Sequence, residues 1–176
     1  MKKTAFRFGM YGVYTMIIFF LVEWFIFGDD TKDYSVREIV GWVGIVLSTI
    51  FVYFGIKYYR DRQNNGMLSF GEGLKLGVLL TLLPALAFGI INVLYILLDP
   101  GFLDSYYNSQ VEQLKNTVPP AELDSKLKAV QEEKEMFANP LVQFIVMFLS
   151  VFVVGLIITV ISALILKRKA DVHAVV

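Results

Sequence analysis

Four long apolar blocks constrain this chain more than any other feature of its sequence. They cover residues 8–27, 39–59, 77–98 and 141–166. A helix needs about 20 apolar residues, at about 1.5 Å each, to cross a hydrocarbon core of about 30 Å. Every block reaches that length, and none alternates apolar with polar residues as the strands of a membrane β-barrel do. The sequence therefore predicts an all-α integral membrane protein built as a bundle of four transmembrane helices.

The composition agrees with a membrane protein. Hydrophobic residues make up 56% of the 176 residues and charged residues 18%, whereas average soluble domains contain about 45–50% and about 25%. Basic and acidic residues balance at 16 each, so no basic field points to nucleic acid. The absence of cysteine excludes disulfides, thiolate metal ligands and cysteine nucleophiles. The length is that of one domain, residues 1–176.

The first apolar block follows basic residues, as in a signal peptide. Lys2, Lys3 and Arg7 resemble a basic leader segment. The apolar stretch is too long for a signal peptide, however, and no small-residue cleavage site follows it. We therefore expect an uncleaved first membrane span.

Capping signals mark where three of the spans should begin. Ser35 with Glu38 and Ser69 with Glu72 each fit a capping box, in which a serine side chain and a carboxylate three residues later bond the helix N-terminus. Asn139 stands before a proline, which suits an N-cap followed by the first helical residue.

The distribution of charge predicts that both termini are cytoplasmic. Loops that remain in the cytoplasm are enriched in Lys and Arg. The two termini and the loop between spans two and three carry 10 of the 16 basic residues and 3 of the 16 acidic ones. Trp24, Trp42 and Tyr95 then fall near the outer interface, where aromatic residues are favoured.

The segment between spans three and four predicts a helical hairpin on the extracytoplasmic side. Residues 100–138 are polar, but apolar residues recur at helical spacing in both halves of the segment. Pro119 and Pro120 separate the halves. The two apolar stripes should face each other and the ends of the spans, or else offer a docking surface to a partner or a second copy.

Short motifs recur together at the ends of the predicted spans. They are Ser69-Phe70-Gly71-Glu72 with Gly77, Asp99-Pro100 with Phe102-Leu103, Asn139-Pro140, and Gly155. With these motifs the chain resembles the membrane protein family catalogued as domain of unknown function 4199. The resemblance covers nearly the whole chain and implies a multi-pass protein of the bacterial inner membrane. It implies no activity, because the family offers no catalytic residues to carry over.

Three polar residues inside the spans are the candidates for chemistry. Glu23 lies in the first span near its outer end, Asn92 in the third and Gln143 in the fourth. Ionisable groups within membrane helices are costly and often functional, although Glu23 could also reach water or pair with Arg37. Together the three could line a polar cavity that opens outward. Alternatively, the two amides serve as hydrogen bonds between helices.

Small residues within the spans predict close helix packing. Gly73 and Gly77 are four residues apart, which lets two helices approach each other. Gly44 and Gly155 are further candidates for such contacts. Pro84 lacks a backbone N–H and should kink the third span.

No cofactor or metal site is predicted. Gly71, Gly73 and Gly77 lack the strand-turn-helix context and the Lys-Ser/Thr ending of a phosphate loop. His173 has no companion ligand. The cluster of Glu132, Glu133 and Glu135 fits a solvated helix face rather than a calcium loop.

These observations favour a protein that is not an enzyme. We expect a lipid-embedded accessory or scaffold subunit that acts by association, with a membrane or periplasmic protein or with further copies of itself. The alternative is a small transporter or channel built on Glu23, Asn92 and Gln143. An enzyme ranks below both because no nucleophile–base pair or metal cluster appears.

Overall fold

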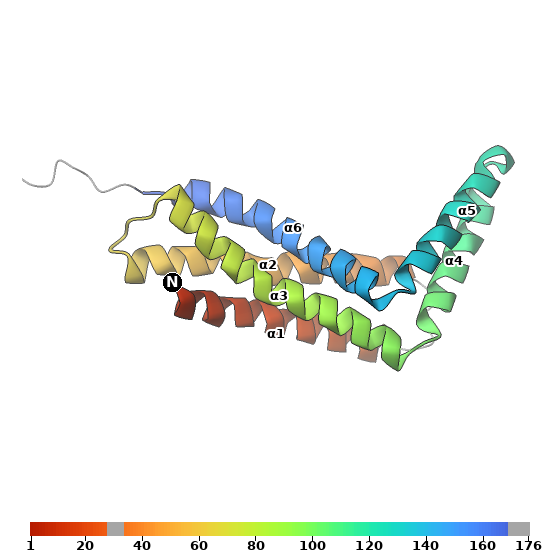
Figure 1. Ribbon diagram of the computed structural model, residues 1–176, viewed down its shortest axis with the longest axis horizontal. Coiled ribbons are helices and arrows are strands. Elements are labelled where there is room, and N and C mark those ends of the chain that lie inside the picture. Colours follow the sequence, from red (N-terminus) through yellow and green to blue (C-terminus); the bar gives the residue numbers. More distant parts are fainter. Residues whose placement is uncertain (28–33, 169–176) are drawn as a thin grey trace, which may run out of the picture.

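The computed structural model describes residues 1–27 and 34–168. This part of the chain is all-helical, with six helices and no strand (Figure 1). The helices are α1 (Lys2–Phe27), α2 (Tyr34–Gln63), α3 (Phe70–Leu98), α4 (Phe102–Thr117), α5 (Pro120–Phe137) and α6 (Pro140–Leu166). Residues Asp29, Asp30 and His173 lie outside the described residues.

Four of these helices are long and apolar enough to cross a membrane, as the sequence predicted. They are α1, α2, α3 and α6, with 26 to 30 residues each. Helices α1, α2 and α3 extend beyond their apolar blocks into more polar sequence, whereas α6 matches its block to within one residue. The chain is therefore a membrane protein by the length and hydropathy of its helices.

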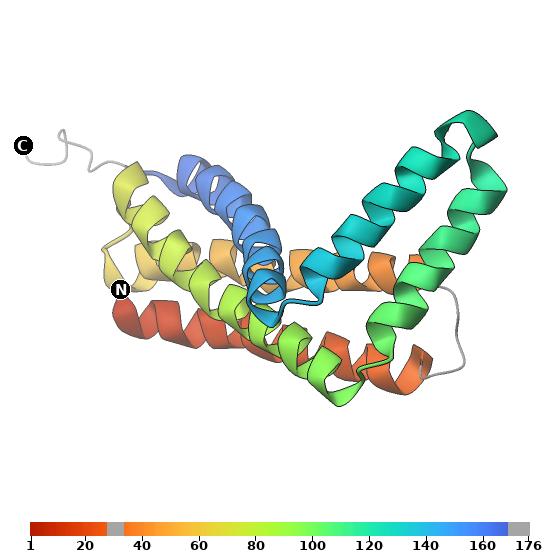
Figure 2. The same cartoon turned by 45° about the vertical axis from the view of Figure 1, so that its right-hand side comes forward.

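The four long helices pack side by side (Figures 1 and 2). The contact between α3 and α6 is the most extensive, while α1 and α6 each pack against both α2 and α3. The N-terminus, the start of α3 and the end of α6 share one end, which we call the tail end (Figure 1). The helices α4 and α5 form an arm that projects from the other end, which we call the arm end (Figure 2).

The contact between α3 and α6 depends on two reciprocal approaches of a glycine to a threonine. A Cβ atom added at Gly77 would overlap the side chain of Thr159, and one added at Gly155 would overlap the side chain of Thr81. All four residues are buried. The hydroxyl of Thr81 donates to the carbonyl oxygen of Gly77 at 2.9 Å, whereas the hydroxyl of Thr159 has no hydrogen-bond partner among the described residues. Small residues therefore bring these two backbones together.

Two further glycines sit at close approaches between helices. A Cβ atom at Gly73 would lie 2.9 Å from Cβ of Ala163, and one at Gly44 would lie 3.0 Å from Cγ of Phe19. Gly44 thus lies at the contact of α2 with α1, and Gly73 extends the contact of α3 with α6. Helix α3 continues through Pro84, which is buried in the packing, and the kink at that residue stays a prediction.

A dense apolar core fills the tail-end half of the molecule. Its largest side chains are at most 1% exposed and come from α2, α3 and the turn before α3. They are Val52, Ile56, Leu68, Leu76 and Leu80. Leu68 also exchanges backbone hydrogen bonds with Arg168 at 2.8 and 2.9 Å, which joins the start of α3 to the end of α6.

The structure tests the predicted helix starts. Ser69 accepts from the backbone N–H of Glu72 while Glu72 bonds the backbone of Ser69, so this capping box is confirmed. The side chain of Asn139 caps α6 by accepting from the backbone N–H two residues later. The capping box predicted at Ser35 is wrong, because α2 already begins at Tyr34 and the Glu38 carboxylate bonds elsewhere.

The arm consists of α4 and α5 packed against each other. The apolar residues of both helices are half-buried, and Tyr107 is buried between them. Lys134 of α5 forms an ion pair with Asp104 of α4 at 2.7 Å. Met136 is the only large apolar side chain of the arm that is clearly exposed, at 47%. The two stripes therefore cover each other, and the outer surface of the arm is polar.

Gly77→Ala tests the contact between α3 and α6. The added methyl group has no room beside Thr159, and overpacking a close contact typically costs about 1–3 kcal/mol. We expect a lower thermal unfolding temperature in detergent, followed by circular dichroism. Gly71→Ala is the matched control, because a Cβ atom at Gly71 meets nothing within 4 Å and should leave the protein as stable as before or slightly more so. Equal unfolding temperatures for the two variants would contradict the close approach.

Candidate functional site

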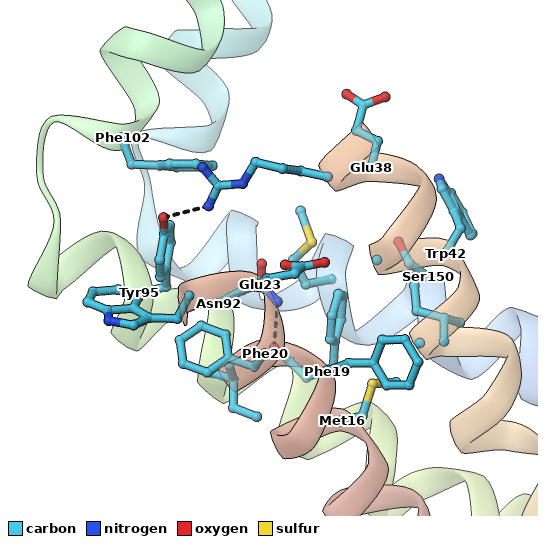
Figure 3. Close-up of a pocket in the computed structure, with 18 of the residues that line it drawn as sticks. Met16, Phe19, Phe20, Glu23, Glu38, Trp42, Asn92, Tyr95, Phe102 and Ser150 are labelled. Carbon is cyan, nitrogen blue, oxygen red and sulfur yellow. Dashed lines mark hydrogen bonds between the residues drawn. The ribbon is translucent and has the colours of Figure 1, made fainter. Parts of the chain in front are cut away.

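A partly open pocket of about 460 Å³ lies among the long helices near the arm end (Figure 3). Helices α1, α2 and α3 supply most of its lining, and α4 and α6 contribute two residues each. Aromatic side chains are the largest group in its walls. The aromatic residues are Phe19, Phe20, Trp24, Tyr34, Trp42, Phe88, Tyr95, Phe102 and Tyr106.

Glu23 places a carboxylate inside this pocket. Its side chain is half-buried and extends from α1 toward α2, where the Cβ position of Gly41 lies 3.6 Å from its Oε1 (Figure 3). Since Gly41 has no side chain, space remains beside the carboxylate. Among the described residues, none forms a hydrogen bond or an ion pair with Glu23. The sequence therefore indicated Glu23 as a candidate site residue, but it did not predict that the carboxylate lacks a hydrogen bond or an ion pair among the described residues.

Arg37 lies across the pocket and is held by aromatic residues. Its Nη2 donates to the hydroxyl of Tyr95 at 3.1 Å. The guanidinium carbon lies 5.8 Å from the ring centre of Tyr34 and 5.4 Å from that of Phe102, within the range of cation–π attraction. The pairing of Arg37 with Glu23 that the sequence suggested is not formed within 4.0 Å, because these aromatic contacts hold the guanidinium elsewhere.

Glu38 links the pocket to the arm. Its Oε1 accepts from the hydroxyl of Tyr106, the second aromatic residue of α4 in the pocket, at 2.6 Å. Burial, followed by the hydrogen bond to Glu38, raises the pKa of the Tyr106 hydroxyl. The phenol therefore stays protonated and donates to the carboxylate at every physiological pH.

Asn92 and Gln143 take different places. Asn92 lines the pocket, but its Nδ2 donates to the carbonyl oxygen of Phe88 in its own helix at 2.9 Å. Gln143 is buried outside the lining, and its Nε2 donates to the backbone carbonyl oxygen of Asn92 at 3.5 Å. The structure thus brings Glu23 and Asn92 into one pocket and places Gln143 behind Asn92 as a contact between α6 and α3.

The pocket ends toward the middle of the molecule. Met16 and Ile45 form part of its lining and also belong to a buried cluster with Ala85 and Val151. The tail-end core lies beyond this cluster, on the side away from the pocket. The pocket is therefore a recess at the arm end, closed from the tail end by packed side chains.

Comparison with known proteins gives one match. The family model described as "Protein of unknown function (DUF4199)" matches residues 7–168. The chain belongs to this family. Comparisons with curated proteins and with solved structures gave no match.

The matched segment of this DUF4199 chain contains every residue that lines the pocket. Sequence reasoning missed Arg37 and the aromatic walls as parts of a site. The available signal was the gathering of Trp and Tyr residues near the predicted outer ends of the spans, which we attributed to the membrane interface alone. In the described part of the chain no group of His, Asp or Glu side chains could hold a metal ion.

Tyr106→Phe tests the bond between the arm and α2. Loss of the hydroxyl leaves Glu38 without its donor, which should weaken the anchoring of α4 by about 1 kcal/mol and speed amide hydrogen exchange at the start of α4. The raised pKa means that this stabilisation is complete below the ordinary tyrosine value of about 10 and is lost only as the pH rises through the folded-state value. Tyr107→Phe is the control, because its contact with Glu133 is 3.4 Å long and its loss should matter less. Faster exchange in the control than in Tyr106→Phe would contradict this assignment.

Proposed function

We propose that this protein is a non-enzymatic accessory subunit of the bacterial inner membrane that acts by binding a molecule in the arm-end pocket. The observation that carries the proposal is the carboxylate of Glu23, which has no hydrogen bond or ion pair among the described residues, in a recess of about 460 Å³. Pockets of a few hundred Å³ with apolar walls and few polar groups are typical ligand sites. A carboxylate in a membrane helix is costly without a partner, and a bound molecule would supply one.

The closed lower end of the pocket favours binding over conduction. A channel needs a polar path through the whole thickness of the bilayer, whereas the tail-end half is filled by side chains such as Ile56 and Leu76 that are 0% exposed. Transport is the second candidate, supported by the presence of Glu23 and Asn92 in one pocket. It would require the four long helices to separate at the tail end.

The arm supports a binding role because it completes the pocket. Phe102 and Tyr106, in the first turns of α4, form part of the wall. The polar outer surface of the arm favours exposure to water rather than burial in lipid. We therefore propose that the four long helices form a membrane-embedded bundle and that the arm stands on the extracytoplasmic side.

Reporter fusions test this orientation. Fusions after Arg62 and after Arg168 should report the cytoplasm, and a fusion after Thr117 should report the outer compartment. Lys and Arg residues gather at the tail end, where Arg60 and Arg62 occupy the last turn of α2, and basic residues favour the cytoplasmic side. A cytoplasmic signal from the Thr117 fusion would overturn the proposed topology.

Gly41→Leu tests the binding role. The leucine side chain would fill the space beside Glu23 without adding charge. We expect wild-type protein purified from native membranes to retain a bound small molecule in native mass spectrometry and Gly41→Leu to lose it. Gly71→Leu is the control. Position 71 lies in the first turn of α3, at the tail end and away from the pocket, where an added Cβ atom meets nothing within 4 Å. A wild-type protein without any bound molecule, or equal retention in Gly41→Leu, would contradict the proposal.

A further inference from the structure

We infer that the arm-end pocket selects an organic cation with an apolar body and binds the cationic group beside Glu23. This inference rests on the proposed binding function and adds the chemical class of the ligand. Three features of the pocket carry it: the balance of charges, the aromatic faces around the carboxylate, and the position of the opening.

The pocket has one charge without a partner in the described part of the chain. Glu23, Arg37 and Glu38 are its charged lining residues. Arg37 is engaged by Tyr95 and by two ring faces, and Glu38 accepts from Tyr106. Glu23 alone has neither a hydrogen bond nor an ion pair among the described residues. The charged side chains of the lining thus sum to one negative charge, and the carboxylate of Glu23 is the one without a direct partner among the described residues.

Aromatic rings beside Glu23 offer a second attraction for a cation. Phe20, Trp24 and Tyr95 pack together, with ring centres 5.6 to 6.1 Å apart. Tyr95 makes edge-to-face contacts with both other rings, so the three rings form one aromatic cluster in the wall. Ring faces carry partial negative charge and attract cations, with quaternary ammonium groups as the established example. The carboxylate and the rings together favour a cation whose surface is itself apolar.

Other ligand classes fit these walls less well. An anion would enter a pocket whose lining contains two carboxylates, and the guanidinium of Arg37 already lies over the rings of Tyr34 and Phe102. A small inorganic cation prefers a shell of several oxygen ligands, whereas most of the lining residues are aromatic or aliphatic and the described residues contain no group of side chains that could hold a metal ion. An organic cation needs only one carboxylate and apolar contact.

The opening lies where an amphipathic molecule would arrive. Trp24 and Trp42 line the pocket and are 45% and 55% exposed. Tryptophan favours the boundary between lipid and water, so we expect this end of the pocket to lie near that boundary. A molecule with a charged group and an apolar body concentrates at the same depth.

Tryptophan fluorescence reads this pocket directly, because the chain has two tryptophans and both line it. The protein is placed in nanodiscs of phosphatidylcholine and titrated with tetraphenylphosphonium and, separately, with benzyltrimethylammonium, two organic cations of different size. Tetraphenylborate, an anion of the same shape as the larger cation, controls for partition into the bilayer. We expect at least one cation to change the emission with saturation and tetraphenylborate to give no saturable change.

Glu23→Gln removes the negative charge and keeps the shape of the side chain. We expect it to weaken binding of the cation by roughly tenfold or more. Glu38→Gln removes the same charge from a carboxylate that already has a partner and should weaken binding far less. Circular dichroism and size-exclusion chromatography verify the fold of both variants, and the comparison between cation and anion needs no variant at all.

Two results would overturn the inference. One is equal binding of tetraphenylphosphonium and tetraphenylborate with no effect of Glu23→Gln. The other is the absence of a saturable change with either cation. Neither result decides the proposed function, which falls only if wild-type protein holds no molecule or Gly41→Leu retains it equally.

Discussion

The close approach of α3 and α6 is the interaction on which the other elements depend. Lipid chains are as apolar as leucine, so helices in a membrane associate through close packing rather than through the hydrophobic effect. The reciprocal contacts of Gly77 with Thr159 and of Gly155 with Thr81 allow this packing. Helices α1 and α2 lie against this pair, and α1 carries Glu23 into the pocket. A small change of distance at the glycines would therefore move the walls of the site.

The site shows how aromatic contacts keep two opposite charges apart. Arg37 and Glu23 line the same pocket, yet the guanidinium contacts Tyr34, Phe102 and Tyr95 instead of the carboxylate. Several modest interactions with rings thus replace one ion pair. As a result, the Glu23 carboxylate has no hydrogen bond or ion pair among the described residues.

The sequence predicted the helices well because length, hydropathy and capping are local properties. The four spans, the break at Pro119-Pro120 and the cap at Ser69 are all visible in short windows of sequence. The error at Ser35 shows the limit of such windows, because Glu38 bonds Tyr106 of α4, which lies 68 residues later in the chain. The pocket itself depends on residues of five helices meeting in space, and no short segment reveals which aromatic rings will face one cavity.

The arm joins the pocket through its first two turns only. Phe102 and Tyr106 touch the site, and the rest of α4 and all of α5 extend beyond it. Helix α4 has 16 residues and is therefore about 24 Å long. Any rotation about Phe102 would therefore displace Thr117 several times farther than Tyr106. If the pocket binds a molecule as proposed, a small change at its wall would become a larger change in the position of the polar tip of the arm.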